Sequence, residues 1–188
     1  MTKTLFSSSA LALLAALAIS PAHAQLLNNS ATVAPSATIA KSDVRWMERA
    51  ARAGIAEVEA GKLAASQGKR DEVRNFGTTM ADHHAKANEE LIAIAQQKRV
   101  LLPNKADRSH LRELKKLASV APDKFDAVYI RDLGIRDHTN AAKLFEDGMT
   151  KLEDPDLKAY AAKYLSMIQR HFQMARDISI SVEAEAKP

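Results

Sequence analysis

The sequence predicts an all-α protein organised around a bundle of four long helices. Its composition favours helices: the 188 residues include only 6 Gly and 6 Pro, and aromatic residues make up 5%, which suits neither a β-sandwich nor a glycine-rich nucleotide-binding fold. Apolar residues recur at intervals of three and four over four segments, and no segment alternates convincingly like a strand. With 46% hydrophobic residues, the chain can bury the core of one compact domain.

The first 24 residues have the three parts of a secretory signal peptide. Lys3 supplies the positive start, Leu5 to Ile19 form a short apolar run, and Ala22-His23-Ala24 is a small-x-small cleavage site. The run is shorter than the about 20 apolar residues of a transmembrane helix, and no later segment is long enough either. We therefore expect cleavage between Ala24 and Gln25, no transmembrane segment in the mature chain, and export of a soluble protein, most simply into a bacterial periplasm.

Five helices are expected after a leader. Residues 25–41 are small, polar and proline-containing, which predicts a flexible leader. The bundle domain should then occupy residues 42–182, followed by a frayed C-terminal tail at 183–188. Within the domain we expect helices over residues 42–67, 70–100, 107–118, 122–151 and 154–180.

The ends of these helices carry local signals. Ser42 or Asp43 can cap the first helix, and Gly68 can close it. Pro122 and the run Asp154-Pro155-Asp156 are typical of helix starts. The links at Gly68 and Asp154 are short, so the helices on either side of each link should be antiparallel. The middle connection of about twenty residues holds a short helix and is long enough to cross the bundle, although a simple up-down-up-down order is also open.

Each long helix has an apolar face, and three of these faces contain a histidine. The faces follow from a rotation of about 100° per residue. On the first helix the face comprises Met47, Ala50, Gly54, Glu57, Gly61 and Ala64; on the second, Val73, Gly77, Met80, His84, Ala87, Leu91 and Ile94. On the third it comprises Val128, Arg131, Ile135, His138, Ala142, Phe145 and Met149; on the fourth, Leu157, Ala161, Tyr164, Ile168, His171, Ala175 and Ile178.

One residue from each helix that an ordinary core would avoid therefore points inward: Glu57, His84, His138 and His171. Neutral imidazoles and one carboxylate are suitable ligands for a divalent transition metal, namely zinc, copper, iron, nickel or manganese. The pattern thus predicts a metal site in the bundle core, although Glu57 and His84 are offset along the bundle axis by about 7 Å, from a rise of about 1.5 Å per residue.

Other polar residues near these faces provide additional candidates for the metal site, and they also allow an alternative in which the histidines form a polar cluster without metal. Asp82 and Asp137 can orient the imidazoles through hydrogen bonds, and Glu146 is an additional candidate ligand. Without metal, the histidines can form a polar cluster with Glu57, Asn88, Tyr164 or water. Two further histidines are expected outside the site: His83 at the boundary of its helix face, and His110 exposed on the short helix.

Several chemistries are excluded. The chain has no cysteine, which rules out disulfides, thiol catalysis, iron–sulfur clusters and cysteine-based zinc sites. No Ser-His-Asp order, phosphate loop or pair of catalytic carboxylates is evident. The formal net charge is +4, but Lys and Arg are interleaved with Asp and Glu and no nucleic-acid motif occurs, so a nucleic-acid partner is not expected.

Five separated motifs resemble a known family. They lie at residues 54–64, 76–88, 136–138 with 145–146, 154–163 and 170–175. Together, over residues 41–177, they resemble domain of unknown function 4142, a bacterial exported family assigned to the ferritin-like superfamily. The resemblance implies export and a ferritin-like four-helix bundle, with the short extra helix in the long middle connection, and it brings no established activity. The family's Asp-His pair matches positions 83–84, where this chain has His83-His84.

The resemblance does not extend to a di-iron site. Di-iron proteins of the ferritin-like kind use two Glu-x-x-His pairs and two further glutamates. The residues three positions before His84, His138 and His171 are Ala81, Ile135 and Ile168. Because none of them is a carboxylate, a ferroxidase or iron-storage centre of the usual type is not expected.

We therefore expect an exported binding or stress-protective envelope protein rather than an enzyme. The first hypothesis is binding of a divalent transition metal by Glu57, His84, His138 and His171. The alternative is a periplasmic interaction or chaperone-like protein whose buried histidines are structural. The sequence identifies neither the metal nor a protein partner.

Overall fold

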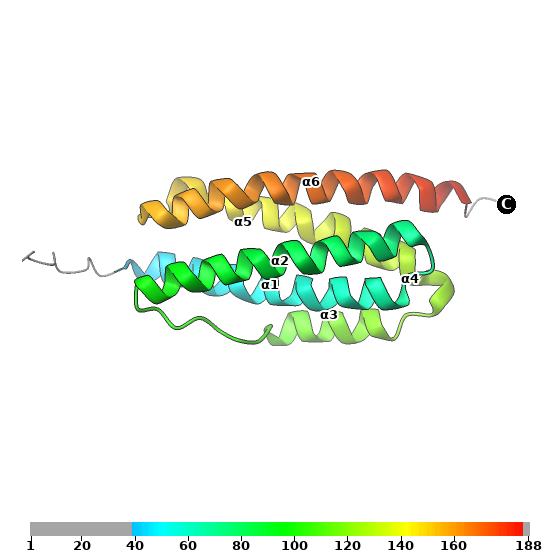
Figure 1. Ribbon diagram of the computed structural model, residues 1–188, viewed down its shortest axis with the longest axis horizontal. Coiled ribbons are helices and arrows are strands. Elements are labelled where there is room, and N and C mark those ends of the chain that lie inside the picture. Colours follow the sequence, from blue (N-terminus) through cyan, green and yellow to red (C-terminus); the bar gives the residue numbers. More distant parts are fainter. Residues whose placement is uncertain (1–38, 186–188) are drawn as a thin grey trace, which may run out of the picture. The chain divides into compact units, whose positions relative to one another are not determined.

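The structure, a computed structural model, describes residues 39–185, and every regular element in that part of the chain is helical. The elements are α1 (Lys41–Gln67), α2 (Asp71–Gln97), α3 (Arg108–Ala118), α4 (Pro122–Tyr129), η1 (Ile130–Asp137), α5 (His138–Lys151) and α6 (Pro155–Glu185) (Figure 1). The all-α prediction is confirmed. The expected signal peptide, most of the expected leader and residues 186–188 of the expected tail lie outside the described residues. None of the described helices combines the length and apolarity needed to cross a membrane.

The segments α4, η1 and α5 follow one another without a break and form the third long helix that the sequence predicts. Only its middle part departs from α-helix, because η1 is π-helical. Together with α1, α2 and α6 it makes four long helices, and α3 is the short extra helix of the middle connection (Figure 1).

The direction of the helices follows from contacts at the two ends of the bundle. The backbone N–H groups of Lys69 and Arg70, in the α1–α2 turn, donate to Asp126 on α4 at 2.9 Å each. At the other end, Asp43 at the start of α1 accepts from the N–H of Asp154 at 2.8 Å, just before α6. The third long helix therefore begins where α2 begins, and α2 and the third long helix are parallel. The middle connection, with α3, crosses the length of the bundle (Figure 1), so the simple up-down-up-down order is excluded.

Several helix ends differ from expectation in their details. The N-cap of α1 is Ala40, which has no capping side chain, so neither Ser42 nor Asp43 caps this helix. Gly68 does end α1, but with φ of −57° rather than in the left-handed region. Asp154 accepts from the N–H groups of Asp156 and Leu157 at 3.0 and 3.2 Å, as its cap signal predicts.

Helices α1 and α2 approach each other closely because small residues face one another. A Cβ atom on Gly61 would lie 2.6 Å from the carbonyl oxygen of Gly77, and one on Gly77 would lie 2.7 Å from that of Gly61. Real Cβ atoms do not come so near to backbone oxygens, so both positions require glycine. This contact sets the position of α1 relative to α2 along the bundle axis, close to Glu57 and His84.

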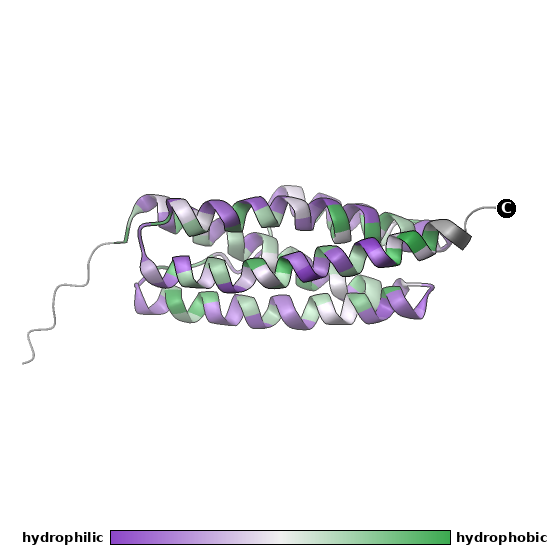
Figure 2. Ribbon diagram, turned by 90° about the horizontal axis from the view of Figure 1, so that it is seen from above, coloured by the Kyte–Doolittle hydropathy of each residue, from purple (hydrophilic) through white to green (hydrophobic). Residues whose placement is uncertain are grey.

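The apolar core is divided into two clusters. One includes Trp46, Leu91, Phe145, Leu157 and Ile168. The other includes Ala60, Phe76, Met80, Phe125 and Ile130. Along every long helix the residues predicted as ligands lie between these clusters, so a polar layer separates two hydrophobic halves. The helices are amphipathic, and Figure 2 shows hydrophilic and hydrophobic residues alternating along them.

The predicted inner faces of α1, α2 and α6 agree with the structure. The predicted face of the third long helix, formed by α4, η1 and α5, is wrong in part. Before His138 the expected face was Val128, Arg131 and Ile135, but Arg131 is exposed and the other two are half-buried. After His138, Met149 was also expected on this face and is exposed. The buried residues before His138 are instead Phe125, Asp126, Tyr129, Ile130, Leu133 and Gly134. The π-helical segment η1 explains the shift, because i→i+5 turns hold more residues than α-helical turns and displace the face that the α-helical rotation predicts.

Candidate metal centre

Three histidines from three helices converge in the polar layer. His84 of α2, His138 of α5 and His171 of α6 are 7%, 1% and 1% exposed. One ring nitrogen of each can be chosen such that the three lie within 4.8 Å of one another. The geometry therefore gathers three imidazoles around one point in the interior.

The hydrogen bonds of His138 define its tautomer. Its Nδ1 lies 2.9 Å from the carbonyl oxygen of Leu133, and a carbonyl only accepts, so Nδ1 carries the hydrogen. The lone pair of neutral His138 is therefore on Nε2. That atom faces Nδ1 of His171 at a distance of 3.4 Å.

His171 also has a partner on its other side. Its Nε2 lies 2.9 Å from Nδ1 of His83, and the two rings are stacked with centroids 5.2 Å apart and planes 16° apart. His83 is exposed, so it links the buried histidines to the surface. The sequence placed His83 at the boundary of its helix face and missed this contact, because rotation about one helix does not reveal which residue of α6 lies opposite.

The environment keeps the three converging imidazoles neutral. Burial lowers the pKa of His84, with further contributions from His138, His171 and His83. Burial also lowers the pKa of His138, and burial together with the neighbouring His138 and His83 lowers the pKa of His171 to about 3. Neutral imidazoles have a free lone pair, which is the form that binds metal ions.

Glu57 lies beside this cluster rather than among the three converging nitrogens. Its Oε1 is 4.0 Å from Nδ1 of His138, the nitrogen that is turned toward Leu133. Burial raises the pKa of Glu57, and the nearby Asp137 and Glu113 raise it further. The pKa of Tyr129 is also raised, by burial and by Glu57; the π-helical shift of the inner face hid Tyr129 from the sequence prediction.

Unpartnered polar atoms are concentrated at this place. Within residues 39–185, the buried side-chain atoms without a hydrogen-bond partner are Glu57 Oε2, His84 Nε2 and Tyr129 Oη. Buried polar atoms normally have partners, so these three atoms are available for a further hydrogen bond and, in the case of Glu57 and His84, for an ion. Glu57 and His84 also line a cavity of about 330 Å³ that reaches α3.

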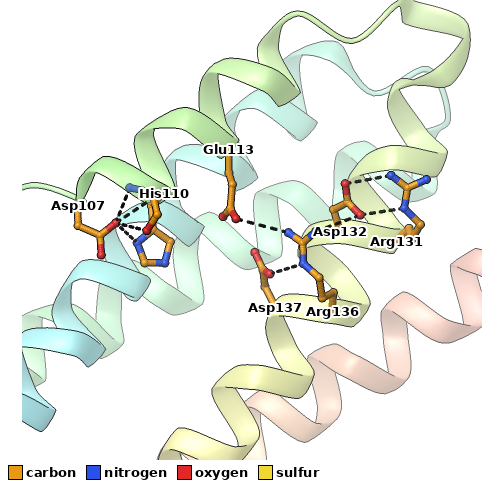
Figure 3. A network of polar contacts seen from close by, with 8 residues as sticks. Asp107, His110, Glu113, Arg131, Asp132, Arg136 and Asp137 are labelled. Carbon is orange, nitrogen blue, oxygen red and sulfur yellow. Dashed lines mark hydrogen bonds and ion pairs between the residues drawn. The ribbon is translucent and has the colours of Figure 1, made fainter.

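The other sequence candidates have different partners. Asp137 pairs with Arg136 at 3.1 Å rather than with His138 (Figure 3), and Asp82 is exposed. The hydroxyl of Tyr164 donates to Glu90 at 2.8 Å. The predictions that Asp137 and Tyr164 form hydrogen bonds with the buried histidines are therefore wrong. The partner of His138 is instead the carbonyl oxygen of Leu133, and that of His171 is His83.

Three residues near the edge of the site complete the description. Glu146 is exposed on α5, where it lines a second cavity of about 260 Å³ together with His138. Asn88 packs against α1 at Gly54, where an added Cβ would lie 2.1 Å from Asn88 Oδ1. His110 is half-buried rather than exposed, and its Nδ1 lies 3.0 Å from Asp107 Oδ1.

Comparisons with known proteins identify the fold and a family. The family model described as domain of unknown function (DUF4142) matches residues 28–178. No curated protein matches the chain. Among solved structures, the crystal structure of a DUF305 fragment from Deinococcus radiodurans is similar with a TM-score of 0.66 and 11% sequence identity, covering 75% of this chain and 97% of that chain. At such low identity the likeness concerns the fold.

Proposed function

The chain belongs to the DUF4142 family, a domain of unknown function, and we propose that it binds a divalent transition-metal ion through His84, His138 and His171. The observation that carries the proposal is the distance of 3.4 Å between His138 Nε2 and His171 Nδ1. Two nitrogens bound to one tetrahedral ion at about 2.0–2.1 Å lie about 3.3–3.4 Å apart. The two side chains thus already have the separation of two ligands of one ion, and His84 Nε2 is buried nearby without a partner.

Metal binding defines the hydrogen positions on the histidines. His138 keeps its hydrogen on Nδ1, bonded to Leu133, and offers Nε2. His171 offers Nδ1 and therefore carries its hydrogen on Nε2, which donates to Nδ1 of His83. Outer hydrogen bonds of this kind hold ligating histidines in position and raise their basicity. His83 is thus part of the proposed site although it does not bind the ion.

The donor set restricts the metal. Three neutral imidazoles with a carboxylate nearby suit zinc, copper, iron, nickel or manganese, and no thiolate is available. Glu57 is the buried carboxyl group nearest to the cluster, and it can balance the charge of the ion or complete the ligand set. The residues do not fit a di-iron centre, because none of the three histidines has a carboxylate three positions before it.

The setting of this site is a ferritin-like bundle in an exported protein. The parallel arrangement of α2 and the third long helix, joined by one connection that crosses the bundle, supports the ferritin-like assignment. The signal-peptide pattern of residues 1–24 supports export to the periplasm, where the protein would bind metal in envelope or stress protection. Mass measurement of the exported protein should give an N-terminus at Gln25, and a chain that retains residues 1–24 would contradict export by this signal.

A second function is favoured by the same hydrogen bonds. The series His83, His171, His138 and the carbonyl of Leu133 forms a complete chain of donors and acceptors when every imidazole is neutral. The histidines of a metal-free interaction or chaperone-like protein would be stabilised in this way. In this alternative His84 Nε2, which has no protein partner, needs a bound water, whereas a metal ion uses this nitrogen directly; for that reason we prefer the metal.

Thermal unfolding separates the two functions. Zinc, manganese, iron(II) or copper at a hundred times its Kd should add about 2.7 kcal/mol of stability, or about 5–10 °C in Tm. His171→Ala should abolish this increment, whereas His110→Ala, which removes a histidine outside the cluster, should retain it. If none of these metals shifts the Tm of the wild type relative to chelator, metal binding is wrong and the interaction protein remains.

A further inference from the structure

The cavity of about 330 Å³ connects α3 to the polar layer. Exposed residues of α3, among them Glu113, line one part of it, and the buried Glu57 and His84 line another. It therefore reaches His84, the residue whose buried Nε2 has no partner, from the α3 side of the bundle.

Among the charged residues that line this cavity, acidic side chains outnumber basic ones. Glu57, Asp107, Glu113 and Asp137 line it, and the lining cations are Arg49 and, when protonated, His110. Asp107 is occupied, because it accepts from the N–H groups of Ser109 and His110 at 2.9 and 3.1 Å. Figure 3 shows Glu113 reaching from α3 toward the helix that carries Asp137.

Arg136 neutralises only part of this charge. It pairs with Asp137 at 3.1 Å and with Asp132 at 3.4 Å, and its distance to Glu113 is 3.9 Å (Figure 3). One guanidinium is therefore shared among three carboxylates, of which Asp132 also pairs with Arg131 at 2.8 Å. Three carboxylates, Glu113, Asp132 and Asp137, are thus set against two guanidinium groups, Arg131 and Arg136, which leaves this cluster with one negative charge in excess.

The other approaches to the histidines are less suitable for a cation. His138 and His171 are each 1% exposed, and the stacked ring of His83 covers His171. The second cavity, which reaches His138, is lined by the ammonium group of Lys143 as well as by Glu146. The cavity beneath α3 combines an acidic mouth with two unpartnered buried atoms, Glu57 Oε2 and His84 Nε2.

We infer that this cavity is the access route of a divalent cation, with Glu113 and Asp137 as a first, transient binding site and Glu57 as the next carboxylate on the way to His84. The inference rests on the proposed metal binding and adds the path to it. A cleft that is lined by one sign of charge raises the local concentration of counterions and increases association rates by about 10–10³-fold. The carboxylates at the mouth therefore act mainly on the rate of binding.

Stopped-flow mixing of the purified protein with cobalt(II), whose visible absorption reports nitrogen coordination, tests this route. Glu113→Gln is the main variant because Glu113 is exposed and its loss should leave the fold intact. We expect the association rate to fall about tenfold, and dissociation to slow in proportion. Asp147→Asn removes an exposed carboxylate that pairs with Lys151, away from the cavity, and should leave the association rate at the wild-type value.

The possible outcomes test separately the access route through the cavity beneath α3 and the binding of metal by the three histidines. Association of Glu113→Gln at the rate of Asp147→Asn would overturn the route and leave metal binding intact. A slower rate in Glu146→Gln, but not in Glu113→Gln, would also overturn it and assign access to the second cavity. Faster dissociation without slower association in Glu113→Gln would make Glu113 a ligand rather than an access residue. If neither cobalt(II) nor zinc, copper, iron(II), nickel or manganese binds to the wild type, both proposals are wrong.

Discussion

Buried carboxylates at the ends of the bundle differ sharply from the one in its middle. At one end Asp126 accepts two backbone N–H groups of the α1–α2 turn, and at the other Asp43 accepts from Glu153 and Asp154 before α6. Glu57, in the middle, has a buried oxygen without a partner. The end carboxylates have a structural role that is already complete, whereas the middle of the bundle has free donors and acceptors for a ligand.

The strongest test of this comparison changes the pH. The pKa of each of His84, His138 and His171 is lowered in the folded chain. Their contribution to the free energy of unfolding is therefore fully present above the pKa of histidine in the unfolded chain, about 6.5, and is lost as pH falls below that value. Below that pH, and down to its own pKa in the folded chain, each histidine lowers the free energy of unfolding by about 1.4 kcal/mol per pH unit. Between pH 7.5 and 5.5 the three histidines together contribute a loss of at most about 4 kcal/mol to the free energy of unfolding of the metal-free protein, as measured by urea unfolding.

Two observations qualify the pH measurement. The raised pKa of Glu57 acts in the opposite sense, because a buried neutral carboxyl favours folding at low pH and loses that contribution as pH rises. His171→Ala should reduce the loss by about one third, since one of three titrating groups is gone. Glu57→Gln removes this opposing carboxyl group, and equal stability of that variant at pH 7.5 and 5.5 would show that the pKa values of the three histidines are not lowered by folding.

Removal of an end carboxylate should have the next largest effect. Asp126→Ala leaves the N–H groups of Lys69 and Arg70 without their acceptor, at about 1–3 kcal/mol for each group that stays buried. We expect the free energy of unfolding to fall by about 3 kcal/mol, measured in urea at pH 7.5. The loss should be the same with metal and with chelator, and a dependence on metal would contradict a purely structural role.

The corresponding change in the middle should be small. Glu57→Gln keeps the shape of the side chain and removes a carboxyl group whose pKa is raised by burial. The stability of the metal-free protein should change by less than about 1 kcal/mol, because no hydrogen bond to Glu57 is lost. Metal affinity should fall, as titration calorimetry would measure. A large loss of stability without metal would show that Glu57 is structural, like Asp43 and Asp126.

The sequence predicts the fold and the convergence of the histidines because both depend on helical periodicity. The inner faces of α1, α2 and α6 have the predicted residues, and His84 of α2, His171 of α6 and His138 of α5 are all buried. For the third long helix the prediction fails before His138, since the π-helical segment η1 changes the rotation per residue. No local sequence pattern predicts this π-helical segment.

Contacts between distant segments account for what the sequence could not reveal. Asp43 and Asp126 have their partners about a hundred and about sixty residues away along the chain, so the sequence could assign Asp43 only to the helix it begins. The contact of His83 with His171 and the cavity beneath α3 also need the relative positions of helices. Whether the histidines bind metal stays a prediction.

The exchange of carboxylates between the two hairpins has a consequence for how the bundle assembles. The turn of the α1–α2 hairpin is closed by a side chain of α4, and the turn of the α5–α6 hairpin by a side chain of α1. A fragment containing only one hairpin would therefore lack the acceptor for its own turn. The two halves are mutually dependent, which favours cooperative, all-or-none folding over stepwise assembly of separate hairpins.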